Sequence, residues 1–465
     1  MTALDIITTI PATSVDALRR RVEGPVVGPE DDGWDAARAA WNLAVDQQPT
    51  AVVVPHSADD VVAAVQVARA HGLRVTAQVT GHNASAYESL QDTILLRMTE
   101  LRDVEIDAAG RRARAGAGCE WRDVVMPAGE HGLAALAGSS PQVSVVGYAL
   151  GGGIGWLARR HGLAADSVLA LDVVTADGEL RRVDAASDPD LYWALRGGGG
   201  SFGIVTAVEL RLFDTGPLVA GAMMWTLERA REIVAAWRDL TLDCPDELTT
   251  SLRMLSVPDD PNVPEPLRGG AFVVIDGAFA GDRAAADAAL APLRALEPIM
   301  DGWMPCGPEA LSFVHMDPEE PMPVQGDTFM LDELPDEAIH QWLELLGPGS
   351  ASPFMMAELR QLGGELARPG AHKGARSPVL GRYLAFLGGV PVSPELSEAM
   401  RARAERVQAA MRRWTARASY LNFAETPGDP ARLFEPEAYE RLRRVKARVD
   451  PDRLFRANHD IPPAE

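Results

Sequence analysis

The sequence contains very little lysine, little cysteine and no long apolar segment. Lysine occurs only at Lys373 and Lys446, so nearly all basic residues are arginines. Cysteine occurs only at Cys119, Cys244 and Cys306, an odd and widely spaced set that predicts neither a disulfide framework nor a zinc site. No apolar run reaches the length of a membrane span. We therefore expect a protein without a metal site and without a membrane partner.

Negatively charged residues outnumber positively charged ones in the chain as a whole. The formal net charge is −22, and phosphate polyanions would be repelled by such a surface. This excludes nucleic acid and anionic membranes as expected partners. Residues 1–21 lack the basic start and long apolar core of a secretory signal. We expect a cytoplasmic protein, and its oligomeric state is not indicated by the sequence.

The chain has the length and composition of a soluble protein with more than one domain. It has 465 residues, of which 47% are hydrophobic and 24% charged. Near the beginning, "TAVVVPHS" predicts a strand and "LRVTAQV" a second one. Between them we expect a helix capped by Ser57 and closed by Gly72. This order predicts a βαβ unit.

The middle of the chain, 216–415, has a different pattern. Five strand candidates are separated by helical segments, which predicts a broad antiparallel sheet covered by helices. The candidates are "LVAGAMMW", "TTSLRML", "GAFVVIDGAFAG", "FMMAELRQLGG" and "GRYLAFLGG". From residue 416 the chain returns to helix and loop.

Glycine clusters are the strongest chemical signal. One lies within 147–155 and a second within 197–203. Glycine allows a backbone to approach a ligand closely, and exposed N–H groups bind pyrophosphate without lysine. Neither cluster matches a Rossmann fingerprint or a P-loop. Each cluster alone is compatible with tight turns, but together with the Gly81–His82 turn they predict a large, extended phosphate ligand.

Four segments resemble one family. They are "TGHNAS", "SPQVSVVGYALGGGIGWLARRHGLAADSVLALDVVTADGEL", "DLYWALRGGGGSFGIVTAVELRLF" and the closing "YLNFAE…YERLRRVKARVDPDRLFRANHDIPP". They resemble FAD-linked oxidases of the berberine bridge enzyme type, in the vanillyl-alcohol oxidase superfamily. The bacterial 6-hydroxynicotine, sugar and antibiotic oxidases are related proteins. The resemblance runs from about residue 25 to the end and is loose in the middle.

The resemblance implies an α+β fold with FAD as cofactor. It implies a two-part FAD-binding domain of the vanillyl-alcohol oxidase type, made of residues 1–213 and 416–465. Residues 216–415 would form an inserted substrate domain. These boundaries agree with the change of pattern along the chain, because cofactor-type motifs occur at both ends and not in the middle.

His82 is the residue that the resemblance marks most clearly. In the family, the histidine of the Gly-His turn is bonded covalently to the 8α-methyl group of the flavin. The family usually has Arg-Ser-Gly-Gly-His there, whereas this chain has Gln78 to Gly81 before His82 and keeps one glycine. A histidine that only hydrogen-bonds the flavin or a carbonyl is the alternative. Ser140 stands where some members have a second, cysteinyl attachment, and serine forms no thioether. Cys119 is expected to be a small buried residue.

Other positions are assigned to FAD by the same resemblance. Val143 matches the oxygen gate, where a small side chain leaves room for dioxygen; ordinary packing is the alternative. Asp166 matches a polar residue near the cofactor or serves as a helix cap. The remaining expected contacts are Thr80, Gly81, Asn83, Ala84, Ser140, Gly147, Gly151, Gly152, Gly155, Gly203, Ile204, Val205, Asn422 and Asn458.

Catalysis requires a base within hydrogen-bond reach of the substrate. Tyr420 and Asn422 match the family's Tyr-x-Asn motif, and Tyr420 is expected to accept or orient a proton. The alternative for Tyr420 is a buried aromatic residue with a satisfied hydroxyl.

The strand "FMMAELRQLGG" provides the other candidates. Glu358 and Arg360 share one face of it and are expected to anchor the substrate, with Gln361 on the opposite face. The alternative is that Glu358 and Arg360 form a structural ion pair where the two domains meet. Tyr383 is a candidate second tyrosine of this sheet, and His315 receives no role.

Two classes of function follow. The first is an oxidase that transfers hydride from a C–OH or C–N bond of a small organic molecule to flavin N5, with dioxygen as acceptor and hydrogen peroxide as product. The alternative is a dehydrogenase, or a non-redox cyclase or binding protein of natural-product biosynthesis that retains FAD. The fold does not choose between them, because function resides in the site.

Overall fold

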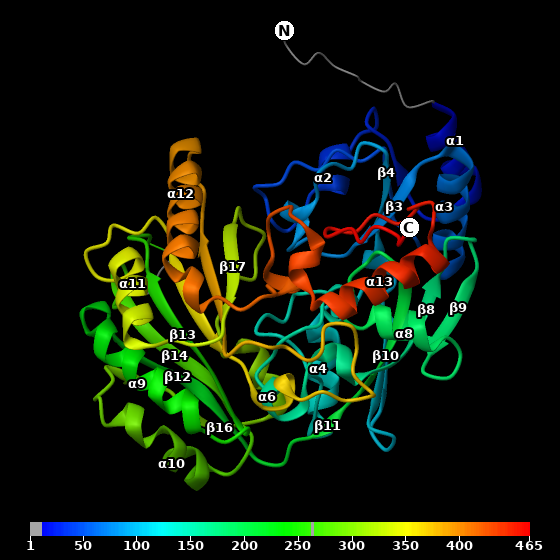
Figure 1. Cartoon of the computed structure of the whole chain (residues 1–465). Helices are drawn as coiled ribbons and strands as arrows, with labels where there is room; N and C mark the ends of the chain where they lie inside the picture. Colours follow the sequence, from blue (N-terminus) through cyan, green and yellow to red (C-terminus); the bar gives the residue numbers. More distant parts are fainter. Residues whose placement is uncertain (1–11, 262–264) are drawn as a thin grey trace.

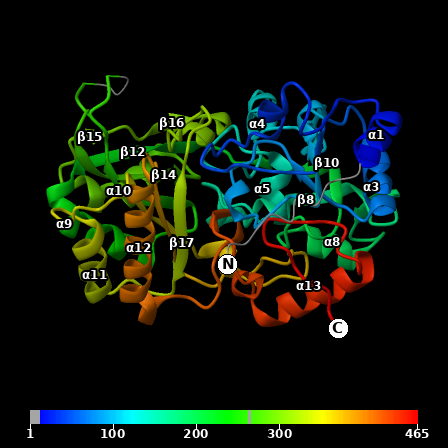
Figure 2. The same cartoon turned by 90° about the horizontal axis from the view of Figure 1, so that it is seen from above.

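The computed structural model describes residues 12–261 and 265–465 and shows two lobes side by side (Figure 1, Figure 2). One lobe contains the two ends of the chain, drawn in blue, cyan and red. The other contains the middle, drawn from green to orange. Residues 1–11, the first half of the segment used to predict the absence of a secretory signal, lie outside the described residues.

The first sheet contains the expected βαβ unit. Helix α3 (Ala58–His71) begins at Ser57, whose side chain accepts a hydrogen bond from the Asp60 backbone, and ends at Gly72 with φ 67°. It connects two strands that are both parallel to a third strand lying between them. The sheet order is β1 (Val26–Val27), β2 (Ala51–Val53), β4 (Thr93–Arg97) and β3 (Arg74–Gln78).

A second, antiparallel sheet and several short helices complete this lobe. The sheet order is β5 (Val104–Asp107), β6 (Arg112–Gly116), β10 (Ile204–Arg211), β8 (Val168–Val174) and β9 (Leu180–Asp184), while β7 (Leu133–Ala134) pairs with β11 (Phe213–Asp214). The helices are α1 (Ala12–Arg21), α2 (Trp34–Arg38), α4 (Trp121–Gly129), α5 (Val145–Leu150), α6 (Ala158–His161), α7 (Ala164–Ser167) and α8 (Pro189–Leu195).

The C-terminal segment packs onto the first lobe. After helix α13 (Pro436–Val449), Phe455 pairs with Val75 of β3. The ammonium group of Lys446, which is fully buried, donates to the carbonyl of Ser201 at 2.6 Å and to Asp450 Oδ2 at 2.6 Å. One of the two lysines of the chain therefore joins α13 to the second glycine cluster.

The middle of the chain forms one large antiparallel sheet, as predicted. All five expected strands are present, and three further strands were not predicted. The longest of these is β17 (Gln325–Leu331), whose first half, "QGD", has a turn-like composition. The order is β15 (Met300–Asp301), β12 (Leu218–Thr226), β14 (Ala271–Phe279), β13 (Leu248–Ser256), β18 (Met356–Gln361), β19 (Tyr383–Gly389) and β17, with β16 (Met304–Cys306) also paired to β12.

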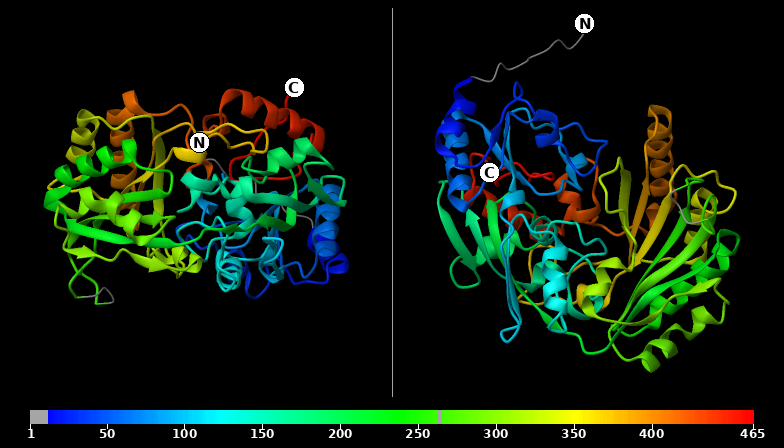
Figure 3. Two further views of the ribbon diagram at one scale, coloured as in Figure 1. Left: turned by 90° about the horizontal axis from the view of Figure 1, so that it is seen from below. Right: turned by 180° about the vertical axis from the view of Figure 1, so that it is seen from behind.

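Four helices cover one face of this sheet (Figure 3). The alternation of side chains along a strand places Leu359 in the core beneath them, while Glu358 and Arg360 face the other lobe. The helices are α9 (Ala230–Asp243), α10 (Arg283–Arg294), α11 (Asp336–Leu346) and α12 (Pro394–Met411).

The apolar cores follow the same division. One cluster contains residues from both ends of the chain, including Val75 and Phe455, and a second contains residues between 219 and 414. At the seam, the buried Arg159 donates to the carbonyls of Leu248 at 2.8 Å and Leu362 at 2.5 Å. The domain boundaries stay a prediction that this distribution of core residues supports.

Candidate active site

A cavity of about 660 Å³ lies between the two lobes, within the range of small-molecule and cofactor sites, about 300–1,000 Å³. One side consists of residues within the segments 80–84, 138–151 and 199–205, which we call the glycine wall. The opposite side is formed by the large sheet and the loop 315–318. Residues within 421–425 and 456–458 line it from the C-terminal segment.

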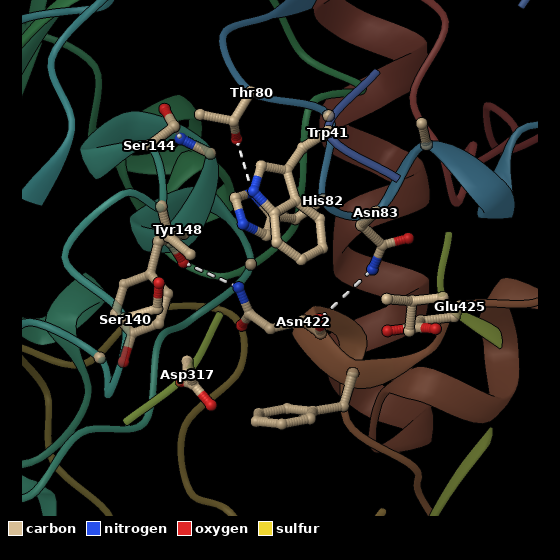
Figure 4. Close-up of a pocket in the computed structure, with 18 of the residues that line it drawn as sticks. Trp41, Thr80, His82, Asn83, Ser140, Ser144, Tyr148, Asp317, Asn422 and Glu425 are labelled. Atoms are coloured by element: carbon tan, nitrogen blue, oxygen red, sulfur yellow. Dashed lines mark hydrogen bonds between the residues drawn. The ribbon is translucent and has the colours of Figure 1, made fainter. Parts of the chain in front are cut away.

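His82 is held firmly at the glycine wall (Figure 4). Gly81 before it has φ 87°, a left-handed conformation that favours glycine. The imidazole stacks on Trp41 with ring centroids 4.3 Å apart, and its Nδ1 is hydrogen-bonded to Thr80 Oγ1 at 2.8 Å. Burial lowers the pKa of His82 to about 4. At neutral pH the imidazole is therefore uncharged, as a nitrogen nucleophile must be.

The glycine wall has room for a ligand beside its glycines, because glycine has no side chain. A Cβ on Gly147 would have no protein atom closer than 3.6 Å, and one on Gly200 none closer than 3.8 Å. Both residues line the cavity. The space that these Cβ atoms would occupy is cavity, so this backbone fits an extended phosphate-bearing cofactor such as FAD.

Most of the predicted site residues line this one cavity. From the cofactor set these are Thr80, Gly81, His82, Asn83, Ala84, Ser140, Val143, Gly147, Gly151, Gly203, Ile204, Val205, Asn422 and Asn458, and from the catalytic set Glu358 and Arg360. Gly152, Gly155, Asp166 and Tyr420 are not among the lining residues.

The absence of Gly152 and Gly155 from the lining has a packing explanation. A Cβ on Gly155 would lie 1.9 Å from the carbonyl oxygen of Ala137, and one on Gly152 would lie 2.6 Å from the Tyr420 hydroxyl. Asp166 accepts hydrogen bonds from Ser377 Oγ and from the backbone of Leu163, the residue before α7. This geometry favours the helix-cap alternative for Asp166.

Tyr420 also lies behind the glycine wall and not in the cavity. It is fully buried, and Arg376 lies over its ring at 4.9 Å. The turn Leu421–Phe423 directs Asn422 and Phe423 to the cavity, whereas Tyr420 points under Gly152. Burial raises its pKa well above the usual value. The geometry favours a buried aromatic residue, although its hydroxyl has no hydrogen-bond partner among the described residues, and gives no support to Tyr420 as the proton acceptor.

Asn422 joins the C-terminal segment to the glycine wall. Its side chain donates to the carbonyl of Tyr148 at 3.1 Å and accepts from the backbone N–H of Gly153 at 3.1 Å. Asn83 donates in turn to the carbonyl of Asn422 at 3.3 Å. The Gly-His turn, the first glycine cluster and the C-terminal segment are thus connected by these side-chain amides.

Charged side chains gather on the opposite side of the cavity. Arg253 donates to Asp276 Oδ2 at 2.5 Å, and Arg360 donates through Nε to Glu358 Oε1 at 2.5 Å. Charges this deeply buried are retained only when they are paired. We call the whole group the charged cluster: Arg253, Asp276, His315, Asp317, Glu358 and Arg360.

His315 lies at the centre of the charged cluster. Its Nδ1 is 2.9 Å from Asp276 Oδ2, and its Nε2 is 3.2 Å from Arg360 Nη2. Because guanidinium only donates, Nε2 accepts and Nδ1 carries the proton given to Asp276. Burial opposes ionisation of Asp276, but the Arg253 charge and the hydrogen bond from His315 hold its pKa below the usual value.

Asp317 connects the charged cluster to the glycine wall. Its Oδ2 accepts from Ser139 Oγ at 2.8 Å, and its Oδ1 lies 3.8 Å from His315 Nε2. Burial opposes ionisation, but His315 and Arg360 together hold the pKa of Asp317 below its usual value. Its side chain is 27% exposed, whereas that of Glu358 is 0% exposed.

Sequence reasoning missed four members of this cluster. His315 was given no role, and Arg253, Asp276 and Asp317 were not considered. A usable signal was present: Asp276 and Arg253 are charged residues inside otherwise apolar strands, and "VHMD" places a histidine two residues before an aspartate. Tyr383, the candidate second tyrosine, packs instead against Trp237 on the helix-covered face.

Other predicted features can be located as well. Within the described residues no disulfide is formed, Cys119 is buried, and burial raises the pKa of its thiol to about 12. In the same part of the chain, no group of acidic, histidine or cysteine side chains is arranged to hold a metal ion. No helix there is long and apolar enough to span a bilayer.

Comparison with known proteins identifies two conserved-domain matches. Residues 49–184 match the FAD binding domain model, and residues 419–462 match the berberine and berberine-like model. The chain is 37% identical over 205 residues to (R)-6-hydroxynicotine oxidase of Paenarthrobacter nicotinovorans, covering 44% of this chain and 45% of that protein. It is 32% identical over 214 residues to glucooligosaccharide oxidase of Sarocladium strictum, covering 45% of this chain and 43% of that protein.

These two alignments therefore span less than half of either relative. A solved structure extends the likeness to nearly the whole chain. It is that of 6-hydroxy-D-nicotine oxidase from Arthrobacter nicotinovorans, with a TM-score of 0.82 and 26% identity, covering 95% of this chain and 98% of that one. The chain therefore contains an FAD binding domain and a berberine-like C-terminal segment, and it has the fold of 6-hydroxy-D-nicotine oxidase.

Proposed function

We propose that this protein is an FAD-linked oxidase that oxidises a C–OH or C–N bond of a small organic molecule. The observation that carries the proposal is the single cavity that contacts both the glycine wall, with His82, and the charged cluster on the sheet. A substrate between these two sides would have a hydride acceptor on one side and polar groups on the other, which is the proximity that such a transfer needs.

FAD, when bound, accepts the hydride from the substrate. His82 would attach it covalently, since its neutral imidazole is a competent nucleophile and Trp41 and Thr80 hold the ring in place. Ser140 offers no thioether, so His82 would be the single attachment. The amide groups of Asn83 and Asn422 would keep the surrounding loops together.

Dioxygen would be the electron acceptor, and the product would be hydrogen peroxide. Val143 lines the cavity two residues before α5, and its side chain is small and apolar. Such a side chain leaves room for dioxygen beside the cofactor. The aliphatic and methionine residues near the sheet end of the cavity, among them Leu255, Met322 and Met356, favour a substrate with apolar parts.

Two measurements test this function. Acid precipitation of the purified protein should leave a yellow, fluorescent pellet, and His82→Ala should release the colour to the supernatant. A colourless wild-type pellet would contradict the covalent link alone. Oxidase activity is tested by peroxide release with a panel of compounds, beginning with 6-hydroxynicotine and a glucooligosaccharide. Flavin that is bleached anaerobically but produces no peroxide in air would indicate a dehydrogenase.

A further inference from the structure

We propose that Asp317 is the group that takes the proton from the substrate, and that His315 receives this proton from Asp317 and stores it. The inference rests on the oxidase function proposed above. It replaces Tyr420, the proton acceptor expected from the sequence, with two residues of the loop 315–318, and it leaves Glu358 as an expected anchor.

Access to the cavity separates the three acidic candidates. The side chain of Asp317 is 27% exposed, and it lines the cavity. Tyr420 is fully buried outside the lining, and Glu358 is 0% exposed and bonded to Arg360 and Ser251. Glu358 also lines the cavity, and its Oε2 has no hydrogen-bond partner among the described residues, but its side chain is not exposed there. A proton acceptor must come within hydrogen-bond reach of the substrate, and of the three side chains that of Asp317 is the most exposed.

Charge balance within the cluster points to the same residue. Asp276 is paired with Arg253, and Glu358 with Arg360, but Asp317 has no arginine or lysine partner within ion-pair distance among the described residues. With a neutral His315 the cluster therefore has one more negative charge than positive charge. An added proton removes this excess, and because the pKa of Asp317 is lowered, the proton does not remain on that carboxylate.

His315 is placed to hold that proton. Its Nε2 is 3.8 Å from Asp317 Oδ1, and its Nδ1–H already donates to Asp276 at 2.9 Å. The charged and polar groups facing the imidazole are Asp276 on β14, Arg253 on β13, Glu358 and Arg360 on β18, Asp317 on its own loop and Ser139 beside Arg360. Arg360 Nη2, now 3.2 Å from Nε2, is also within 3.3 Å of Ser139 Oγ, which remains as its partner when Nε2 becomes protonated.

Asp317 also lies near the part of the glycine wall that is expected to contact the flavin. It accepts a hydrogen bond from Ser139, next to Ser140. Its charge acts on His82 as well, because Asp317 partly opposes the lowering of the His82 pKa by burial.

The chemical step balances as follows. The O–H or N–H bond of the substrate breaks, and its proton passes to Asp317 Oδ1 and then to His315 Nε2. FAD, when bound, would take up the adjacent C–H hydrogen with its electron pair as hydride, and a C=O or C=N bond would form. Dioxygen would receive these two electrons with two protons, one from the transferred hydride and one from His315, and would leave as hydrogen peroxide. Asp317 would be the catalytic residue, while His315 and Asp276 act through it.

The first test needs no substrate. Asp317→Asn should raise the midpoint potential of the bound flavin, measured by anaerobic titration with a dye and an enzymatic reductant, because an anion near the flavin opposes added electrons. The matched control is Glu320→Gln, which removes the same charge from an exposed position three residues away in the same loop. Equal potentials for Asp317→Asn and wild type would overturn the proposal.

The second test uses the compound of the panel that bleaches the wild-type flavin anaerobically. Asp317→Asn should reduce the rate of bleaching about 10²–10⁴-fold, the usual effect of losing a general base. Glu320→Gln should bleach at the wild-type rate. His315→Gln should bleach more slowly and move the acid limb of the rate–pH profile to lower pH, since a carboxylate alone ionises below an imidazole.

The outcomes distinguish this proposal from the proposed function. If wild type is bleached and Asp317→Asn bleaches at the same rate, the proton acceptor is wrong while the oxidase function stands. If no compound of the panel bleaches wild type, the activity with those compounds fails, and the potential of Asp317→Asn still decides whether the carboxylate lies at the flavin. Unfolding midpoints of all variants, measured by circular dichroism, distinguish a slower bleaching reaction from a loss of folded protein.

Discussion

The two sides of the cavity are built in opposite ways. The glycine wall consists largely of glycines and small residues in short contiguous segments, and it presents backbone. The charged cluster consists of long charged side chains brought together from Arg253, Asp276, the loop 315–318 and the strand of Glu358. A surface made of backbone groups suits a cofactor, which is the same in every turnover. Side chains on a sheet can be exchanged one at a time without changing the backbone, which suits a surface that contacts the substrate. The comparison teaches that cofactor contact and substrate contact leave different traces in a sequence.

The largest expected effect is on unfolding free energy, and it distinguishes two glycines of the first lobe. Gly155→Ala would place a Cβ 1.9 Å from the Ala137 carbonyl, so we expect a loss of about 4 kcal/mol or more of unfolding free energy. Gly200→Ala has no atom within 3.8 Å of its Cβ and should fold normally but bind less FAD. Chemical denaturation and the flavin absorbance per mole of protein measure the two effects. Similar stability of both variants would contradict the distinction between glycines that make room for packed protein atoms, such as Gly155, and glycines that line the cavity, such as Gly200.

The next effect concerns the charged cluster. Arg253→Met removes the guanidinium from Asp276, which is fully buried, and leaves its charge without that partner. We expect a loss of about 3–5 kcal/mol in unfolding free energy. Adding Asp276→Leu to the same chain should recover much of it, because the uncompensated charge is then gone. A double-mutant cycle by urea denaturation measures the coupling, and additive effects would contradict the buried pair.

A pH effect is expected at Glu425, which lines the cavity between the two sides. Burial and the neighbouring Asp327 raise its pKa to about 7, against the backbone N–H of Gly326 that lowers it. The folded protein therefore holds a proton that the unfolded chain releases near the ordinary glutamate pKa of 4.5. The stabilisation is present below pH 4.5 and is lost as the pH rises to about 7, by about 3 kcal/mol.

Glu425→Gln makes this pH effect measurable. The variant keeps a neutral side chain at every pH, so it should gain stability relative to wild type between pH 4.5 and 7 and show a constant difference above that range. Unfolding free energies of both proteins across this range provide the measurement. A difference that does not change with pH would mean that Glu425 ionises normally in the folded state.

The smallest effect is expected at Tyr420. Because its ring is buried outside the cavity lining and its hydroxyl has no hydrogen-bond partner among the described residues, Tyr420→Phe should change the rate of flavin bleaching by less than about twofold and should not lower the unfolding free energy. Asp317→Asn is the variant with which to compare it. A loss of about 100-fold in Tyr420→Phe would show that the hydroxyl takes part in catalysis and that the turn at 421–423 opens during turnover.

Sequence reasoning located the glycine wall well because its segments are local. The cap at Ser57, the turn at Gly81 and the glycine clusters depend on backbone conformation, which neighbouring residues determine. The tertiary structure nevertheless gives the glycines of the first cluster different positions. Gly147 and Gly151 line the cavity, while Gly152 and Gly155 make room for other parts of the protein. Which glycines face a ligand depends on what packs behind them.

The sequence by itself determined the fold class, the family, the antiparallel middle sheet and the position of His82 beside the cofactor segments. The charged cluster was decided by the tertiary structure alone. Arg253 and Asp276 become neighbours because β13 pairs with β14, and Asp317 reaches Ser139 across 178 residues of sequence. Long-range strand pairing and loop docking bring these charges together, and no local pattern specifies such contacts. The residues that we assign to proton transfer were therefore the ones that the sequence did not reveal.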